Sequence, residues 1–269
     1  MTPTGSALRE RLGQLAGCED VGLAETALLL AALDQPGPME PALASLDRLA
    51  AALKREQGVG QQAAALASLL SEWHGFRLDD QDNDLSANLF WVLEHHQGTP
   101  EILALLWLEV ARRAGWNAQA LAFPGCLLVR LEDEDGNRII IDPALGGHVL
   151  TAFDLRAQLK AMAGLAAELE PRLFAPLSNR DILLRLQNEV KLRVLRSGRV
   201  TAAVAIVEAM LLFAPDQTAL WREAGMMHMR LDNLPAAIAA LEQFVARAGN
   251  SPARRRTQLL LQEIRARMI

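Results

Sequence analysis

The spacing of apolar residues predicts helices over the first quarter of the chain and strands only after residue 115. Between residues 5 and 75, apolar residues recur three or four positions apart, which places them on one face of a helix. These stripes are Leu8, Leu12 and Leu15; Leu23, Ala27, Leu30 and Leu33; Leu43, Leu46, Leu49 and Leu53; and the run from Ala63 to Leu70. Prolines and glycines at 36–38, 58 and 60 separate them. We therefore predict an N-terminal helical region over residues 1–75.

A longer apolar run follows a strong helix-start signal at residue 99. Thr99 suits the N-cap, Pro100 suits the first helical position, and Glu101 places a negative charge in the first turn. From Ile102 to Val110 nearly every residue is apolar, so this helix is buried on most sides, and Gly115 ends it. We predict that it is the central helix of a core domain over residues 76–175.

Three β-type runs follow the central helix, namely Ala118–Phe123, Cys126–Glu132 and Arg138–Ile141. Asp135-Gly136 between the last two predicts a hairpin. If these two residues form a two-residue turn, Cys126 lies opposite Leu145 and Asp142 points to the other side of the sheet. A bulge or a three-residue loop would place Cys126 and Asp142 on one face. The predicted fold class is α+β, mainly helical, with a small antiparallel sheet.

The last ninety residues contain a helical repeat. Small and bulky residues recur with the pattern and the 34-residue period of tetratricopeptide repeats. The second repeat shows it at Trp221, Gly225, Ala237, Leu241 and Phe244, and the first at Ala203, Val207, Met210 and Pro215. Gln187 and Lys191 replace the usual aromatic residue and glycine of the first repeat, and Ala253–Ile264 would form a capping helix. We predict tetratricopeptide-like α-α repeats over residues 180–269.

Composition places the chain among ordinary globular proteins, with 51% hydrophobic and 22% charged residues. Cys18 and Cys126 are too widely separated to form a disulfide framework, and they cannot supply a four-ligand zinc site. Neither a secretory signal nor an apolar segment of membrane-spanning length is recognisable. The expected location is the cytoplasm, without membrane association.

Charge divides the chain unevenly. Residues 180–269 carry 14 Arg and Lys against 8 Asp and Glu, whereas residues 1–179 carry 13 against 24. A repeat array offers a concave surface to a protein or peptide partner, and we name Arg185, Arg193, Arg222 and Arg230 as candidates for a basic groove. The alternative is that the repeats only pack against the rest of the protein. The basic run Arg254-Arg255-Arg256 has no interleaved aromatic residues, so nucleic-acid binding is not expected.

Two polar groups could be mistaken for metal sites. Asp79, Asp80, Asp82 and Asp84 lack the central glycine and the terminal acid of an EF-hand loop. His95 and His96 are adjacent, so on a helix they point about 100° apart and cannot easily share one ion. We expect no metal and no cofactor.

The motifs of the core and the repeats together resemble one bacterial family. Gly98-Thr99, the central helix ending Val110-Ala111-Arg112-Arg113, Pro124-Gly125, and Ile141-Asp142-Pro143 with Gly146-Gly147 resemble the transglutaminase-like, papain-like core of the SirB-type family. That family couples the core to C-terminal tetratricopeptide repeats. Its transglutaminase-like relatives carry a Cys at the start of the central helix, a His after Pro-Gly, and an Asp before Pro. The resemblance maps these positions to Pro100, Cys126 and Asp142.

Both reactive groups are replaced in this chain. A proline has no nucleophile, and a cysteine in place of the histidine removes the general base, which contributes ~10²–10⁴-fold to such reactions. The sequence therefore predicts a non-catalytic protein with a degenerate Cys-His-Asp site that acts as a protein-interaction or regulatory module. The alternative is a cysteine-dependent acyltransferase or amide hydrolase with Cys126 as nucleophile, His148 or another His as base, and Asp142 as orienting acid. In the competing interpretation Cys126 is a small, buried, apolar-like residue.

Overall fold

The computed structural model describes residues 4–53, 58–81 and 83–266. Asp82, one of the four acids considered above, lies outside the described residues. The chain divides into two compact units. The core unit contains Asp20–Leu186, and the repeat unit joins Thr4–Glu19 to Gln187–Ile269.

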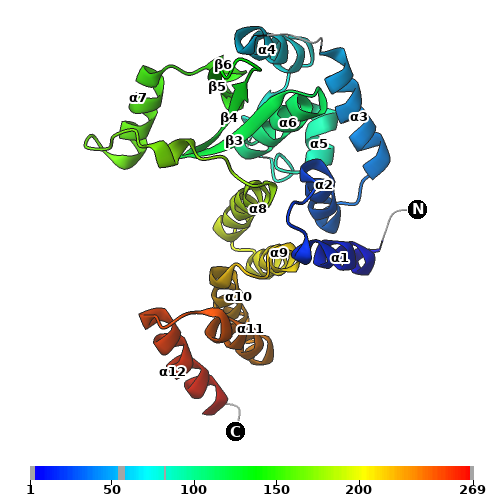
Figure 1. Ribbon diagram of the computed structural model, residues 1–269. Coiled ribbons are helices and arrows are strands. Elements are labelled where there is room, and N and C mark those ends of the chain that lie inside the picture. The colour runs from blue at the N-terminus through cyan, green and yellow to red at the C-terminus, as the bar shows by residue number, and fades with distance from the viewer. Residues whose placement is uncertain (1–3, 54–57, 82, 267–269) are drawn as a thin grey trace. The chain divides into compact units, whose positions relative to one another are not determined.

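Helices form most of the core unit (Figure 1). Its last helix, α8, begins in this unit and continues into the repeat unit. The helices are α2 (Leu23–Asp34), α3 (Met39–Ala52), α4 (Val59–Leu66), which continues as a π-helical segment (Ala67–Trp73), α5 (Leu89–His95), α6 (Pro100–Arg113), α7 (Ala152–Ala163) and α8 (Asn179–Arg196), with short 3-10 helices η3 (Pro143–Leu145) and η4 (Pro171–Phe174).

A four-stranded antiparallel sheet lies between α6 and α7, with its strands in chain order (Figure 1). Its strands are β3 (Asn117–Phe123), β4 (Cys126–Glu132), β5 (Arg138–Asp142) and β6 (His148–Val149). A second, parallel pair is formed by β1 (Arg77–Leu78) and β2 (Gln97–Gly98), directly before α6. The predicted fold class, mainly helical with a small antiparallel sheet, is confirmed.

The connection between β4 and β5 is longer than the two-residue turn considered from the sequence. Glu132 pairs with Arg138, which leaves five residues, 133–137, in the loop. The Asp133 carboxylate accepts hydrogen bonds from the backbone amides of Asp135 and Asn137, at 3.1 and 2.9 Å. Gly136 has a φ of +80°. The Asp-Gly signal located the hairpin, but the Asp133 side chain set its length and register.

Helix α6 is the centre of the core unit. Every residue from Ile102 to Ala111 is buried, as the apolar run predicted. The helix packs against β3, β4 and η3 on one side and against α2 and α3 on the other. On the opposite face of the sheet, α7 covers a second apolar cluster that includes Phe123, Leu128 and Leu155. Burial on both faces fixes the sheet between two helical layers.

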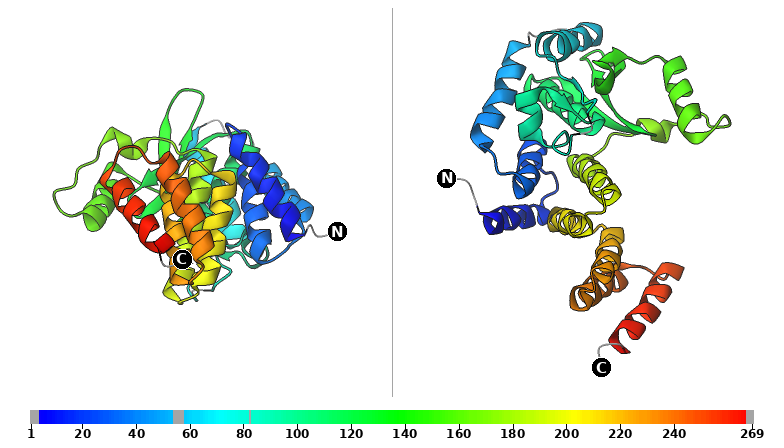
Figure 2. Two further views of the ribbon diagram at one scale, coloured as in Figure 1. Left: turned by 90° about the horizontal axis from the view of Figure 1, so that it is seen from below. Right: turned by 180° about the vertical axis from the view of Figure 1, so that it is seen from behind.

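The repeat unit contains α1, the end of α8, and four further helices packed in sequence (Figures 1 and 2). These are α1 (Gly5–Gln14), followed by the short 3-10 helix η1 (Leu15–Gly17), then α9 (Val200–Phe213), α10 (Thr218–Arg230), α11 (Leu234–Arg247) and α12 (Pro252–Ala266). Helices α9 and α11 begin 34 residues apart, as do α10 and α12. A Cβ atom at Gly225 would lie 2.6 Å from the Leu241 side chain, so the repeat needs glycine there. The tetratricopeptide-like architecture is confirmed.

Helix α1 belongs with the repeats by its contacts. It buries Leu8 and Leu12 and packs against α9, where Arg9 lies 3.8 Å from Glu208. The division into units thus separates α1 from the rest of the N-terminal region that we predicted over residues 1–75. Periodicity alone shows that α1 has an apolar face but not which helix covers it.

Candidate functional site

The start of α6 holds a proline where the resemblance implies a catalytic cysteine. Thr99 takes the N-cap position with an extended backbone, and Pro100 is the first helical residue. The Thr99 side chain makes no capping hydrogen bond to the helix, so the start relies on the Pro100 ring and on local packing. At Gly98, a Cβ atom would lie 2.8 Å from the Ile102 side chain. The Gly-Thr-Pro sequence therefore has a structural explanation.

Cys126, the residue at the base position, is the first residue of β4 and is half-buried. It packs against the apolar cluster under α7. Burial, followed by the nearby Asp142 carboxylate, raises the pKa of its thiol to about 11, while Arg185 opposes the shift and Glu101 adds to it. The thiol is protonated at neutral pH, whereas a reactive cysteine needs its thiolate.

Asp142 ends β5 and is buried. Its carboxylate accepts a hydrogen bond of 2.9 Å from the Ala144 amide and so caps η3. Its own carbonyl accepts a hydrogen bond of 2.9 Å from Gly147. Burial raises the pKa of the Asp142 carboxyl, with the backbone amides of Ala144 and Leu145 and the charge of His148 acting in the opposite direction. Asp142 therefore holds the turn after β5.

The strand register places Cys126 and Asp142 on one face of the sheet. Val129 lies opposite Ile141, and directly opposed residues point the same way. Cys126 is three residues before Val129 and Asp142 is one residue after Ile141, so both point to the other face. The charges of Asp142 and Glu101 both act on the Cys126 thiol. The structure thus places Cys126 and Asp142 on one face of the sheet, and the charge of Glu101 in the first turn of α6 also acts on the Cys126 thiol.

His148, the candidate base for Cys126, lies on a strand that does not pair with β4. It is exposed on β6 and pairs with Asp142 across the strands. Since the strand order is β4, β5, β6, strand β5 lies between the strand that carries Cys126 and the strand that carries His148. A Cys-His-Asp site needs the imidazole in the middle, where it can take the proton from sulfur.

The glycines next to these residues explain other parts of the motif. Gly147 has a φ of +82°, and a Cβ atom there would overlap the Trp107 indole of α6. Gly125 has a φ of +81°, and Met162 of α7 lies 2.8 Å from the position of its missing Cβ. Apolar side chains of α7 therefore lie directly beside the Pro124-Gly125-Cys126 turn.

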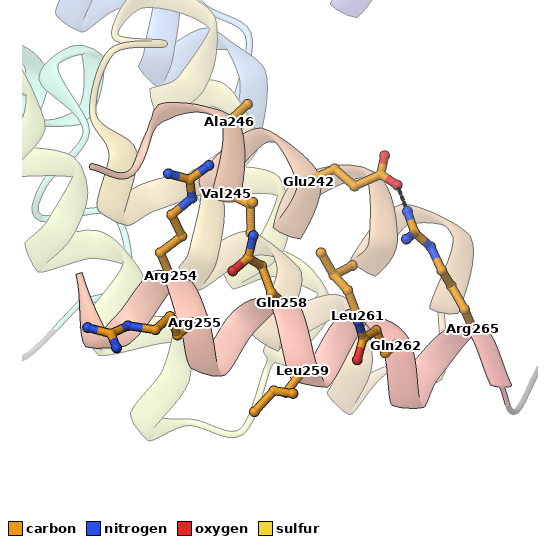
Figure 3. A pocket seen from close by; sticks show the side chains of 10 residues that line it. All are labelled: Glu242, Val245, Ala246, Arg254, Arg255, Gln258, Leu259, Leu261, Gln262 and Arg265. Carbon is orange, nitrogen blue, oxygen red and sulfur yellow. Dashed lines mark hydrogen bonds and ion pairs between the residues drawn. The ribbon is translucent and has the colours of Figure 1, made fainter. Parts of the chain in front are cut away.

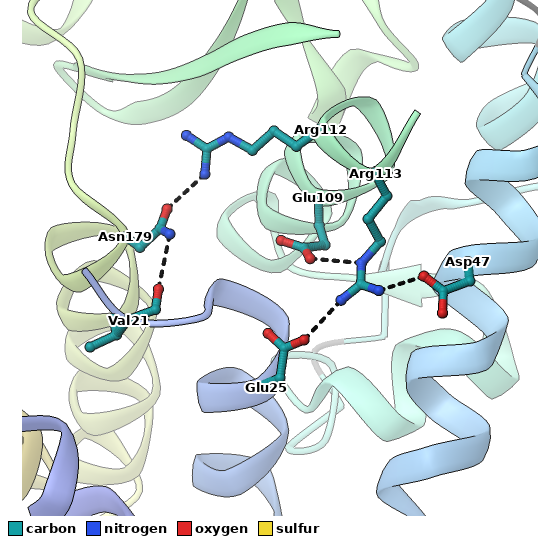
Figure 4. Close-up of polar contacts among 7 residues, drawn as sticks. All are labelled: Val21, Glu25, Asp47, Glu109, Arg112, Arg113 and Asn179. Atoms are coloured by element: carbon teal, nitrogen blue, oxygen red, sulfur yellow. Dashed lines mark hydrogen bonds and ion pairs between the residues drawn. The ribbon is translucent and has the colours of Figure 1, made fainter. Parts of the chain in front are cut away.

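A polar network at the other end of α6 was missed by the sequence reasoning (Figure 4). Arg113 contacts Glu109 at 2.8 Å, Glu25 of α2 at 3.0 Å and Asp47 of α3 at 2.5 Å. Burial raises the pKa of Glu109 although Arg113 opposes the shift. The sequence signal that was available is a Glu four residues before an Arg in an otherwise apolar helix.

Arg112 extends this network toward α8 (Figure 4). It donates to the Ala118 carbonyl at 2.9 Å and to the Asn179 amide oxygen at 2.7 Å, and Asn179 donates to the Val21 carbonyl at 2.9 Å. The sequence interpretation placed both arginines in the last turn of the helix but gave them no partners. Together they fasten the end of α6 to three other helices.

The four candidate arginines for a basic groove lie in different surroundings. Arg185 belongs to the core unit and donates to the Cys126 carbonyl at 3.3 Å, and Arg193 is partly buried beside Glu189 at 3.4 Å. Arg222 and Arg230 are exposed on α10. Between them lies Met226, which is 40% exposed, and 34 residues earlier Leu192 is 48% exposed. Leu192 and Met226 thus occupy equivalent positions in two successive repeats, and we call these two residues with Arg222 and Arg230 the exposed row.

The comparisons with known proteins agree with this architecture. The profile of the transglutaminase-like superfamily matches residues 40–188, and a tetratricopeptide-repeat profile matches residues 190–262. The chain belongs to the transglutaminase-like superfamily. Among relatives, UPF0162 protein PA3419 of Pseudomonas aeruginosa is 31% identical over 222 residues, 80% of each chain. Protein SirB1 of Salmonella typhimurium is 26% identical over 190 residues, 70% of each chain, which confirms the SirB-type resemblance.

Other matches are partial. A UPF0162 protein of Xylella fastidiosa is 28% identical over 62% of this chain, and the match spans only 60% of that relative's length. A crystal structure of menin aligns with a TM-score of 0.42 at 10% identity, covering 91% of this chain and 71% of menin, a likeness too low to carry an argument. Within the described residues, no helix is long and apolar enough to cross a membrane. No group of three or more His, Cys, Asp or Glu is placed to hold a metal ion in that same part of the chain.

Proposed function

We propose that this protein is a non-catalytic interaction module, in which a transglutaminase-like core supports a protein-binding repeat region. The observation that carries the proposal is the protonated Cys126 thiol beside a helix start that has no nucleophile. Burial and the carboxylates of Asp142 and Glu101 disfavour the thiolate. An acyl-transfer site needs the reverse arrangement, with a thiolate stabilised by a helix start and an imidazole.

The alternative of a Cys126-dependent acyltransferase or amide hydrolase has less support. It requires an imidazole within reach of the sulfur, and His148 lies on β6, with β5 between it and the strand of Cys126. It also requires room for a substrate at Cys126, where apolar residues of the α7 cluster pack. Cys126 is better explained as a small apolar residue of this cluster.

The binding side of the proposal rests on the exposed row of the repeat unit. Met226 and Leu192 expose apolar surface, and Arg222 and Arg230 lie one helical turn to either side of Met226. Apolar contacts flanked by arginines fit an acidic segment of a protein partner. A nucleic acid is less suitable, because the residues of the Arg254-Arg255-Arg256 run point in different directions around α12. The proposal includes a cytoplasmic location, for which two cysteines that are not joined in a disulfide are suitable.

Alkylation of Cys126 tests the non-catalytic assignment. In a Cys18→Ser background, we expect the iodoacetamide rate at Cys126 to rise about tenfold per pH unit from pH 7 to pH 10, because only the thiolate reacts. Mass spectrometry of the modified peptide measures the rate at each pH. A rate that levels off below pH 8, or an acyl adduct formed with an activated ester at neutral pH and lost in Cys126→Ser, would support the enzyme instead.

Charge reversal on α10 tests the binding assignment. Wild type, Arg222→Glu/Arg230→Glu, Cys126→Ser and the control Arg156→Glu, at an exposed site on α7, are used as baits against an extract of the source cells. We expect a partner retained by wild type, Cys126→Ser and Arg156→Glu but lost by the double variant. Equal recovery by all four baits would remove the binding assignment of this row.

A further inference from the structure

A groove in the repeat unit lies between α11 and α12 (Figure 3). Its volume is about 720 Å³. Val245 and Ala246 line it from α11, and Arg254, Arg255 and Leu259 line it from α12. We call it the end groove. All of these residues belong to the repeat unit, so the groove is defined within one compact body.

The 34-residue period shows what kind of surface the end groove is. Subtracting 34 maps Leu259 of α12 onto Gly225 of α10. Gly225 is buried by α11, with Leu241 lying 2.6 Å from the position of its missing Cβ. Leu259, in contrast, is 61% exposed. A helix that packed on α12 in the way that α11 packs on α10 would therefore lie in the end groove.

The same 34-residue offset shows how the end groove differs in charge from the equivalent surface of α10, which α11 covers. Leu220 and Trp221 of α10 correspond to Arg254 and Arg255 of α12. In the inner repeat, the Arg247 guanidinium at the end of α11 lies over the Trp221 ring, 5.0 Å from its centroid. A helix that docked on α12 in the same way would bring its own last residues to Arg255. These residues must be acidic to be stable beside that guanidinium.

The surroundings of Arg254 also indicate an acidic ligand. Figure 3 shows its side chain extending from α12 toward α11. Its Nε atom is buried and has no hydrogen-bond partner among the described residues. Glu242, the acid that lines the groove, pairs with Arg265 at the far end instead. A carboxylate from outside would satisfy the Arg254 donor.

We infer that the end groove binds an amphipathic helix of a partner protein whose last turn carries carboxylates. The apolar face of that helix packs on Val245 and Leu259, and its acidic end lies at Arg254 and Arg255. This surface is distinct from the row around Met226, so the inference does not rest on that row. The competing explanation is a polar cap facing solvent, which terminal repeats commonly have. A solvent cap would not discriminate between helices by the charge of their last residue.

Two peptides distinguish these explanations. The first has the sequence of Leu234–Arg247, the helix that fills the equivalent place on α10, and the second carries Arg247→Glu. Each is labelled with a fluorophore at its N-terminus and titrated with the full chain while anisotropy is recorded. We expect the acidic peptide to bind at least tenfold more tightly than the native peptide. Arg255→Glu in the protein should reverse that preference, because the glutamate would attract the arginine that ends the native peptide and repel the glutamate that ends the other.

The control is Arg256→Glu, which makes the same charge change one residue away at an exposed position that does not line the groove. At about 150 mM salt, screening limits charge effects to about 8 Å, so this variant should keep the wild-type preference. Arg222→Glu/Arg230→Glu should also keep it, which separates this test from that of the proposed function. Equal binding of the two peptides, an unchanged preference in Arg255→Glu, or no binding up to ~1 mM would overturn the inference.

Discussion

The two ends of α6 differ in what their side chains do. At its start, Pro100 replaces the nucleophile, and the adjacent Cys126 thiol is held protonated by burial and carboxylates. At its end, Arg113 pairs with three carboxylates, and Arg112 is bonded to two further segments. The chain thus keeps the contacts that anchor the central helix but lacks the groups that would make its start reactive. Under the proposed function, this helix keeps its role in the fold without a role in a reaction.

The largest effect is expected at the anchored end. Arg113→Met should destabilise the protein by about 3 kcal/mol, because it leaves Glu109 buried without its cation. Urea unfolding followed by circular dichroism measures the loss. The control is Arg156→Met, at an exposed position on α7, which should change stability by less than about 0.5 kcal/mol. If the two variants were equally stable, the network around Arg113 would not be an anchor.

The cost of Arg113→Met should depend on pH. Burial raises the folded-state pKa of Glu109 above 4.5, and Arg113 opposes this rise, so the variant should raise that pKa further. A carboxyl whose pKa is higher in the folded state contributes stability that is present below its unfolded pKa and is lost as pH rises through its folded pKa. The penalty should therefore shrink between pH 7 and pH 5. Adding Glu109→Gln should remove this pH dependence, and a penalty that grew at low pH would contradict the account.

A smaller effect is expected where the Asp-Pro turn meets α6. Gly147→Ala should cost about 2 kcal/mol, because it forces a positive φ on alanine and pushes a methyl group against Trp107. Gly136→Ala is a matched control, since Gly136 has a φ of +80° with nothing within 4 Å of its missing Cβ. The difference in urea midpoint between the two variants measures the contact of the new methyl group with Trp107 and Ala67. Identical midpoints would show that this contact contributes nothing.

The sequence predicted what depends on local patterns. The run from Thr99 to Arg113 predicted where α6 begins and ends, and the 34-residue period identified the repeats. Both signals lie within one or two helices, so they can be recognised without knowledge of distant contacts. Contacts between distant segments were not predictable. Arg113 reaches partners 66 and 88 residues away, and α1 packs on a helix of the repeats. The register that places Cys126 with Asp142 depends on the Asp133 side chain, which the Asp-Gly signal does not reveal.

The smallest effect on stability is expected from a substitution at the start of α6. The same substitution tests most directly whether this helix start can support a reactive cysteine. Pro100→Cys should cost only about 0.4–1 kcal/mol, the usual value of a proline at a compatible position. Yet the new thiol would lie at a helix start, which favours the thiolate, whereas the pKa of Cys126 is raised to about 11. In a Cys18→Ser background, iodoacetamide at pH 7 should therefore modify residue 100 faster than Cys126. Equal rates at the two positions would mean that Glu101 cancels the helix dipole, and that the start of α6 would be unreactive even with its nucleophile restored.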